Sequence, residues 1–207
     1  MSRSFLPRRR QIAALLLLAL ACSDEKPRSK PQQPVGWDSE IALTPASDLD
    51  PAPNVVEITL TAKPATLSIR PGTTSSVWTY NGALPGPLIR AKVGDRLVVH
   101  FKNELPEATT IHWHGVRVPA SMDGTAAVQS PVQPGESFDY AFDLLDAGTF
   151  WYHPHVRSSG QVGLGLYGAI VVDDPRSPPL GDDLVLILSD ASIDATGAVS
   201  PPDDQGW

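Results

Sequence analysis

The sequence lacks residues on which several classes of protein depend. Cys22 is the one cysteine among 207 residues, which excludes a disulfide framework, a cysteine-rich zinc site and an iron–sulfur cluster. The apolar run from Ile12 to Ala21 would rise only about 15 Å as a helix, about half the hydrocarbon thickness of a membrane, so it is too short to be a membrane-spanning helix. Basic charge is also scarce: 16 Lys and Arg stand against 23 Asp and Glu, for a net charge of −7. A nucleic-acid partner, whose phosphates need a basic face, is therefore not expected.

Proline, by contrast, is abundant, with 21 residues. Each proline removes an amide donor and fixes φ, which disfavours long helices and favours short strands joined by turns. Segments with strand character, bounded by turn residues, are Val55–Leu60, Thr66–Arg70, Val77–Tyr80, Arg96–Lys102, Ser137–Phe142, Thr149–His153 and Gly168–Val172. Their spacing predicts an all-β fold, a sandwich or barrel.

The segment Arg96–Lys102 shows the clearest alternation. Leu97, Val99 and Phe101 lie on one face of an extended chain and are predicted to be buried. His100 lies on the other face with the basic residues Arg96 and Lys102, so we expect a surface histidine on a cationic face rather than a metal ligand.

The N-terminal part has the features of an export signal followed by a tether. Residues 1–22 combine four arginines, the short apolar run and small residues before Cys22, as in a signal segment. The end of this segment, Ala19–Cys22, resembles a bacterial lipobox, and the alternative is ordinary cleavage after Ala21. Residues 23–53 are rich in proline and polar residues and are predicted to form a flexible linker. We expect export to the bacterial cell envelope or periplasm, with a lipid anchor at Cys22 as the contact with the membrane.

The remainder divides at a proline-rich boundary. Residues 54–175 have the length of a single sandwich. Leu184–Leu188 is predicted to be another apolar strand, so residues 176–207 are interpreted as the beginning of a second, truncated domain. The alternative is that this strand folds back on the first sheet.

Four of the five histidines form two His-x-His pairs, His112-Trp113-His114 and His153-Pro154-His155. On a strand, residues i and i+2 project from the same face about 6.7 Å apart, so each pair can present two imidazoles to a metal. Imidazole sites suit copper, zinc, iron or nickel, and the spacing alone leaves copper and zinc both open. The sequence therefore predicts a metal site built from His112, His114, His153 and His155.

Several motifs around these histidines resemble, in the same order, those of the multicopper oxidases, laccase-like copper enzymes, and specifically their N-terminal plastocyanin-like (cupredoxin) domain. The matching segments are 81–89 with Gly94-Asp95, His112–Gly115, Met122-Asp123-Gly124, Pro134-Gly135-Glu136, Gly148–His155 and Gly165–Gly168, within about Val55 to Asp174. The resemblance implies a Greek-key β-sandwich or barrel of cupredoxin type.

The resemblance also implies a role for each histidine. By position, His112 would bind a type 2 copper, and His114, His153 and His155 would bind the type 3 pair of a trinuclear cluster. In the family this cluster reduces O2 to water while a reducing substrate is oxidised at a type 1 copper, which needs a cysteine and further histidines from a C-terminal cupredoxin domain. We therefore expect the chain to be part of a copper-dependent oxidoreductase and to supply half of the cluster ligands. The other ligands would come from a missing C-terminal domain or a partner chain, so this chain alone is expected to be inactive.

Two other functions remain open from the sequence. One is an envelope lipoprotein that binds copper through the same histidines without catalysis. The other is a zinc hydrolase in which a carboxylate such as Asp123 acts as the general base. Two interpretations are open for three residues near the histidines, Trp113, Gly115 and Asp123. They either support the metal site or are ordinary packing and turn residues.

Overall fold

The structure, a computed structural model, describes residues 43–178 and 183–202. The chain divides into two units, residues 1–40 and 41–207, and all that follows concerns the second. The predicted signal segment, residues 1–22, and most of the predicted linker lie outside the described residues. Within the described ranges, no helix has the length and apolar character needed to cross a membrane.

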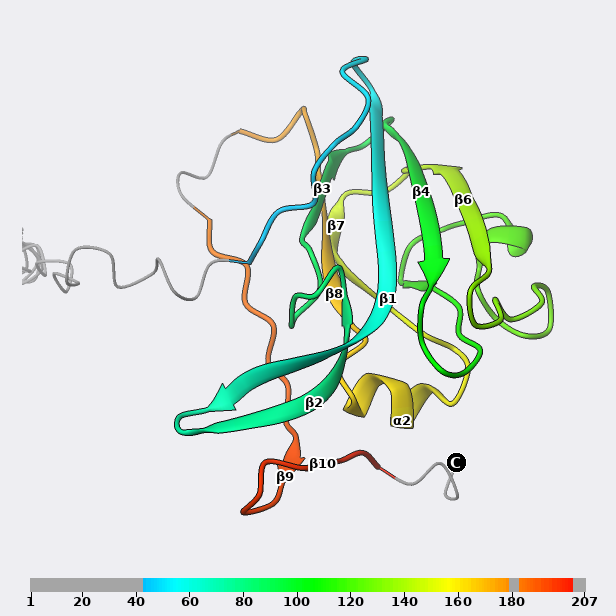
Figure 1. Ribbon diagram of the computed structural model, residues 1–207. Helices are drawn as coiled ribbons and strands as arrows, with labels where there is room; N and C mark the ends of the chain where they lie inside the picture. The colour runs from blue at the N-terminus through cyan, green and yellow to red at the C-terminus, as the bar shows by residue number, and fades with distance from the viewer. Residues whose placement is uncertain (1–42, 179–182, 203–207) are drawn as a thin grey trace, which may run out of the picture. The chain divides into compact units, whose positions relative to one another are not determined.

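Two four-stranded sheets make up the body of this unit (Figure 1). The first contains, in spatial order, β2 (Thr73–Tyr80), β1 (Val55–Arg70), β4 (Arg96–Asn103) and β6 (Ser137–Asp143). The second contains β3 (Ile89–Lys92), β8 (Gly168–Asp173), β7 (Gly148–His153) and β5 (His112–His114). The other elements are the 3-10 helix η1 (Ala120–Met122), the short helix α2 (Ser158–Gly163) and a small ladder of β9 (Ser192–Ile193) and β10 (Val199–Ser200). The prediction of an all-β fold is confirmed.

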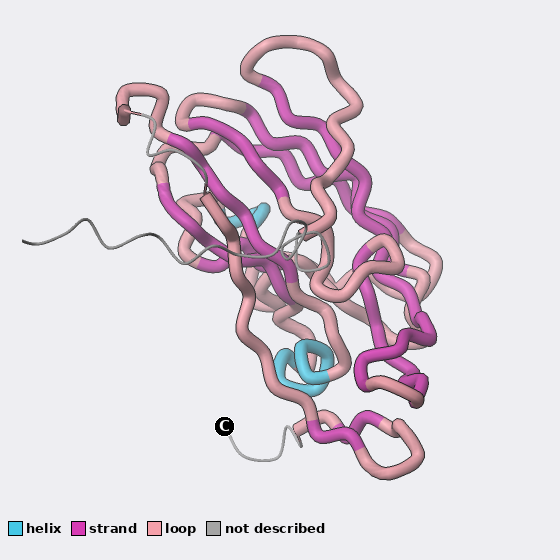
Figure 2. Tube along the Cα trace, turned by 90° about the vertical axis from the view of Figure 1, so that its left-hand side faces the viewer, coloured by secondary structure: helices cyan, strands magenta, loops and turns pink. Residues whose placement is uncertain are grey.

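The core forms between the two sheets, which lie as two layers in Figure 2. From the first sheet, Leu97, Val99 and Phe101 are fully buried, as the alternation in β4 predicts. From the second sheet, Trp113 and Tyr152 enter the same cluster, and the two rings lie 6.1 Å apart between centroids. Since both layers bury one face against the other, the fold is a β-sandwich.

One prediction about the strands is wrong: Val55–Leu60 and Thr66–Arg70 are parts of the single strand β1. The strand changes partner along its length, pairing with β4 up to Ala62 and with β2 from Ala62 onward. Pro64 is tolerated because it lies opposite Trp78, whose N–H points away from β1 and donates to the Leu164 carbonyl. In such a non-hydrogen-bonded pair the missing amide proton of proline breaks no ladder bond.

His100 lies on the outer face of the first sheet, away from the other histidines. Its Nε2 contacts the Glu57 carboxylate at 2.7 Å and its Nδ1 contacts the Asp139 carboxylate at 2.9 Å. The hydrogen bond to Glu57, and next that to Asp139, raises the pKa of His100 above its usual value. The expectation of a surface histidine holds, but its neighbours on the adjacent strands are acidic.

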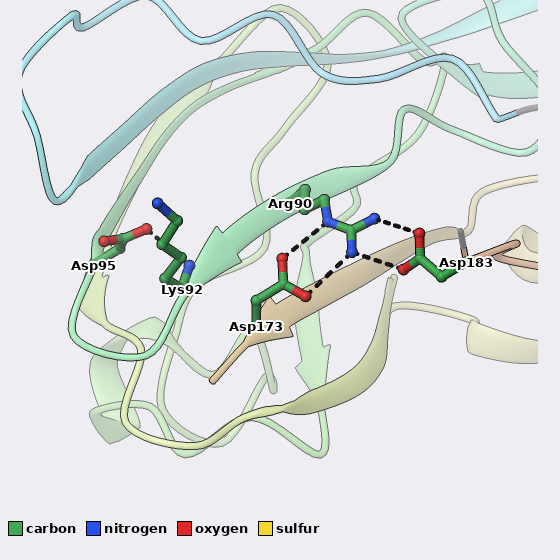
Figure 3. Close-up of polar contacts among 5 residues, drawn as sticks. All are labelled: Arg90, Lys92, Asp95, Asp173 and Asp183. Carbon is green, nitrogen blue, oxygen red and sulfur yellow. Dashed lines mark hydrogen bonds and ion pairs between the residues drawn. The ribbon is translucent and has the colours of Figure 1, made fainter. Parts of the chain in front are cut away.

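The segment Leu184–Leu188 is not a strand, contrary to the prediction. It is held by side chains instead: the Arg90 guanidinium on β3 binds both Asp173 on β8 and Asp183 (Figure 3). A groove of about 1010 Å³ lies between this segment and the outer face of β7 and β8, so no backbone ladder joins them. A second domain beginning at residue 176 stays a prediction.

Candidate metal centre

The first histidine pair lies on β5, at the edge of the second sheet. β5 pairs antiparallel with β7, in a register that places His112 opposite His153, Trp113 opposite Tyr152 and His114 opposite Trp151. Because side chains alternate along a strand, the imidazoles share the outer face while Trp113 and Tyr152 point into the core. The predicted i, i+2 geometry is confirmed for this pair.

The second pair departs from that geometry. β7 ends at His153, so His155 lies in the turn that leads to α2 rather than on a strand. The backbone N–H of His155 donates to the Thr110 hydroxyl at 3.2 Å, which ties the turn to the segment just before β5. The His112–His114 arm and the His153–His155 arm, as we call the two pairs, therefore meet through a turn as well as through the sheet.

All four predicted site histidines lie together. The ring of His112 has its centroid 4.3 Å from that of His155, 5.3 Å from that of His153 and 5.7 Å from that of His114. The rings of His153 and His114 are 5.5 Å apart. His112, His114 and His153 each offer a nitrogen within 4.8 Å of the others. His155 adjoins this set through His112.

Hydrogen bonds select which nitrogen of two rings carries the lone pair. Since a carbonyl can only accept, Nδ1 of His112 donates to the Asp123 carbonyl at 2.8 Å, and Nδ1 of His153 donates to the Pro154 carbonyl at 2.8 Å. The lone pair of each ring is therefore on Nε2, and that of His153 can accept a hydrogen bond from Nδ1 of His114. A backbone acceptor that fixes tautomer and orientation is typical of metal-binding histidines.

The remaining geometry suits a metal ion. Nδ1 of His114 and Nε2 of His153 are 3.3 Å apart. Two nitrogens bound at about 2.0 Å to one tetrahedral ion would be separated by about 3.3 Å. A donor set of imidazoles fits copper, zinc, iron or nickel.

The electrostatics favour the neutral form that a metal ligand needs. Burial is the main cause that lowers the pKa of His153 to about 4; the hydrogen bond to the Pro154 carbonyl opposes it, and the neighbouring histidines add to it. Partial desolvation by neighbouring residues lowers the pKa of His155, and the neighbouring His112 lowers it too. Both shifts favour the uncharged form of the ring.

The contacts of three neighbouring residues show which of them support the histidine cluster and which pack in the core or in a turn. Trp113 is fully buried among aromatic side chains and belongs to the core. Asp123 supports the site directly, since its carbonyl orients His112 and its carboxylate lies 3.4 Å from the same nitrogen. Gly115, with φ of +84°, ends β5 in a conformation that favours glycine. Its role is in the turn.

The His-x-His spacing did not reveal two further residues at the site. Trp151 stacks on His153 at 3.9 Å with 23° between the planes, and lies 5.1 Å from His114. Its position two residues before His153 on a strand could have indicated a shared face. Gln161, fully buried in α2, contacts the segment that precedes β5, and nothing in the local sequence pattern marks it.

The chain is similar in sequence to known proteins. A family model described as multicopper oxidase matches residues 61–177. The chain is 43% identical over 142 residues to the multicopper oxidase MmcO of Mycobacterium tuberculosis, covering 69% of this chain and 28% of that protein. It is 43% identical over 115 residues to copper resistance protein A of Escherichia coli, covering 54% of this chain and 19% of that protein.

A solved structure gives the same picture. The multicopper oxidase from Campylobacter jejuni, described as a metallo-oxidase, superimposes with a TM-score of 0.61 at 39% identity, over 65% of this chain and 29% of that one. The chain thus spans between about a fifth and a third of the length of these three proteins.

Proposed function

Because the chain belongs to the multicopper oxidase family, we propose that it is the copper-binding N-terminal portion of an exported multicopper oxidase. In this proposal it contributes four histidine ligands to a trinuclear copper cluster that reduces O2 to water. The observation that carries it is the convergence of two His-x-His arms, distant in sequence, on one face of the second sheet.

The proposed ligand roles follow the order of the family motifs. His112 would bind the type 2 copper, and His114, His153 and His155 would bind the type 3 pair. The type 1 copper, where a reducing substrate gives up electrons, needs a cysteine thiolate. Since Cys22 lies in the predicted signal segment, we propose that this site and the other cluster ligands come from a C-terminal cupredoxin domain or a partner chain.

The residues of this chain would act by holding ligands in place. When bound, the copper ions supply the one-electron steps by which O2 is reduced. The Asp123 and Pro154 carbonyls orient the rings of His112 and His153, and burial keeps the His153 ring uncharged. Trp151 covers one face of His153 and excludes water from it. His114 and His155 are exposed, which leaves this side of the cluster accessible to further ligands.

A second candidate is a non-catalytic copper-binding lipoprotein of the cell envelope. The relative named copper resistance protein A favours a role in copper handling. It would use the same four histidines, and the proposed export, periplasmic location and lipid anchor at Cys22 apply to both candidates.

The reading frame and the activity of the intact protein separate the two candidates. For the oxidase, we expect sequence beyond Trp207 to contain a His-Cys-His motif with further histidines. We also expect the copper-loaded intact protein to consume O2 when given a phenol or a reduced metal ion, and the 207-residue chain alone to consume none. A stop directly after Trp207, with tight copper uptake and no O2 consumption, would support the lipoprotein. Retention of zinc alone, when both metals are offered, would contradict both.

A further inference from the structure

Little backbone pairing holds the two histidine arms against each other. β5 is three residues long and lies at the edge of its sheet, where β7 is its one ladder partner among the described residues. His155 is beyond the end of β7, so the ladder does not fix it. A short edge strand held by one ladder is expected to move easily, and the cluster needs a further link between the arms.

Gln161 supplies that link. Its side chain is fully buried in α2, the helix that follows the His153–His155 arm. Its Nε2 donates to the Glu107 carboxylate and to the Ala108 carbonyl, each at 2.9 Å. Its Oε1 accepts from the Thr109 hydroxyl at 2.7 Å. Both amide protons and the carbonyl are therefore satisfied by three consecutive residues that lead into β5.

Two neighbouring contacts run in parallel with this amide. The Arg157 guanidinium, just before α2, donates to the Glu107 carboxylate at 2.9 Å. The His155 backbone N–H donates to the Thr110 hydroxyl. These bonds join the His153–His155 arm and the segment after it to the segment before the His112–His114 arm.

We propose that Gln161 is a positioning residue that sets the His153–His155 arm against the His112–His114 arm, so that the four imidazoles are arranged before metal binds. The inference rests on the proposed function, since it concerns the same copper ligands. Gln161 does not touch the imidazoles; it acts through Thr109 and α2.

The physical reason lies in the cost of leaving the amide's partners without bonds. In Gln161→Leu, a side chain of similar size cannot bond the fully buried Thr109 hydroxyl or the half-buried Ala108 carbonyl. The segment before β5 can then separate from α2. The ligand rings on the two arms would lose their mutual spacing.

The test compares copper affinity with thermal stability in matched variants of the full chain. Gln161→Leu is the main variant, and Thr109→Val removes its hydroxyl partner. The control is Thr79→Val on β2 in the other sheet, which removes a comparable bond from a fully buried hydroxyl to the Lys63 carbonyl at 3.0 Å. Calorimetric titration with Cu²⁺ should show about tenfold weaker binding for Gln161→Leu, within the range found when groups supporting metal ligands are removed. Thr109→Val should weaken binding severalfold, and Thr79→Val should leave it unchanged at a similar loss of Tm.

A readout without metal separates this inference from the proposed function. In the metal-free chain, NOEs between the ring protons of His112 and His155 should be seen, because their centroids are 4.3 Å apart, and should weaken in Gln161→Leu. Unchanged copper affinity and unchanged NOEs in Gln161→Leu and Thr109→Val would overturn the positioning role. If the unaltered chain takes up no copper, the proposed function fails, while loss of the NOEs would still support the positioning role. Should Gln161→Leu fail to fold, the pair Thr109→Val and Thr79→Val decides.

Discussion

Replacement of His114 by alanine is expected to weaken Cu²⁺ binding by about a hundredfold or more while leaving the chain folded. Removing a group that merely supports a ligand costs about 10- to 100-fold in metal affinity, and His114 is proposed as a ligand itself. Its ring is exposed at the edge of the second sheet, so the core does not depend on it. We expect the free energy of unfolding to change by about 0.5 kcal/mol or less, as at other surface positions. Titration with Cu²⁺ and urea unfolding measure the two quantities.

His100→Ala is the matched control, because His100 lies in the other sheet between two carboxylates. It should retain the copper affinity of the unaltered chain. Equal losses of affinity in the two variants, or unfolding of His114→Ala, would contradict the assignment and indicate a structural role for the histidine.

Replacement of Gly124 by alanine is expected to destabilise the fold by about 3 kcal/mol or more. Gly124 has φ of +79°, and an added Cβ would lie 2.0 Å from the Ile111 carbonyl oxygen. The left-handed conformation costs a side chain about 1–2 kcal/mol, and an overpacked site adds about 1–3 kcal/mol. The clash falls between the turn that contains Asp123 and the start of β5, so the carbonyl that orients His112 should also shift. Copper affinity is then expected to fall together with the free energy of unfolding.

Gly135→Ala isolates the clash from the backbone conformation. Gly135 has φ of +84°, but an added Cβ would meet no atom within 4 Å. Its replacement should cost about 1–2 kcal/mol, the conformational part alone. If urea unfolding gave the same loss for both variants, the close approach of Gly124 to β5 would have no energetic weight.

Much of the fold could be predicted because the alternation of apolar residues is strong. β4 shows it most clearly, and its buried face is the one predicted. The errors arose where pairing partners, which a single strand does not reveal, decide the structure. Val55–Leu60 and Thr66–Arg70 were predicted as separate segments, yet β1 is continuous and Pro64 occupies a non-hydrogen-bonded pair within it. Leu184–Leu188 has the composition of a strand but no ladder with a neighbour among the described residues.

At the site, the spacing of the histidines was sufficient to identify the residues that meet. The resemblance to multicopper oxidases is confirmed by the match over residues 61–177, which makes copper the cofactor of the family to which the chain belongs. The position of His155 was not predictable in the same way, since it depends on where β7 ends. Nor was the contact of Gln161 with residues before β5, because that contact spans more than fifty positions of the chain.

The central claim is that His112, His114, His153 and His155 hold copper together. Anomalous diffraction at the copper edge, from crystals of the copper-loaded chain, tests it most directly. We expect copper peaks about 2 Å from the free nitrogens of these four imidazoles, with His100 unliganded. Copper bound elsewhere, or imidazoles that turn away from a common position, would contradict the account.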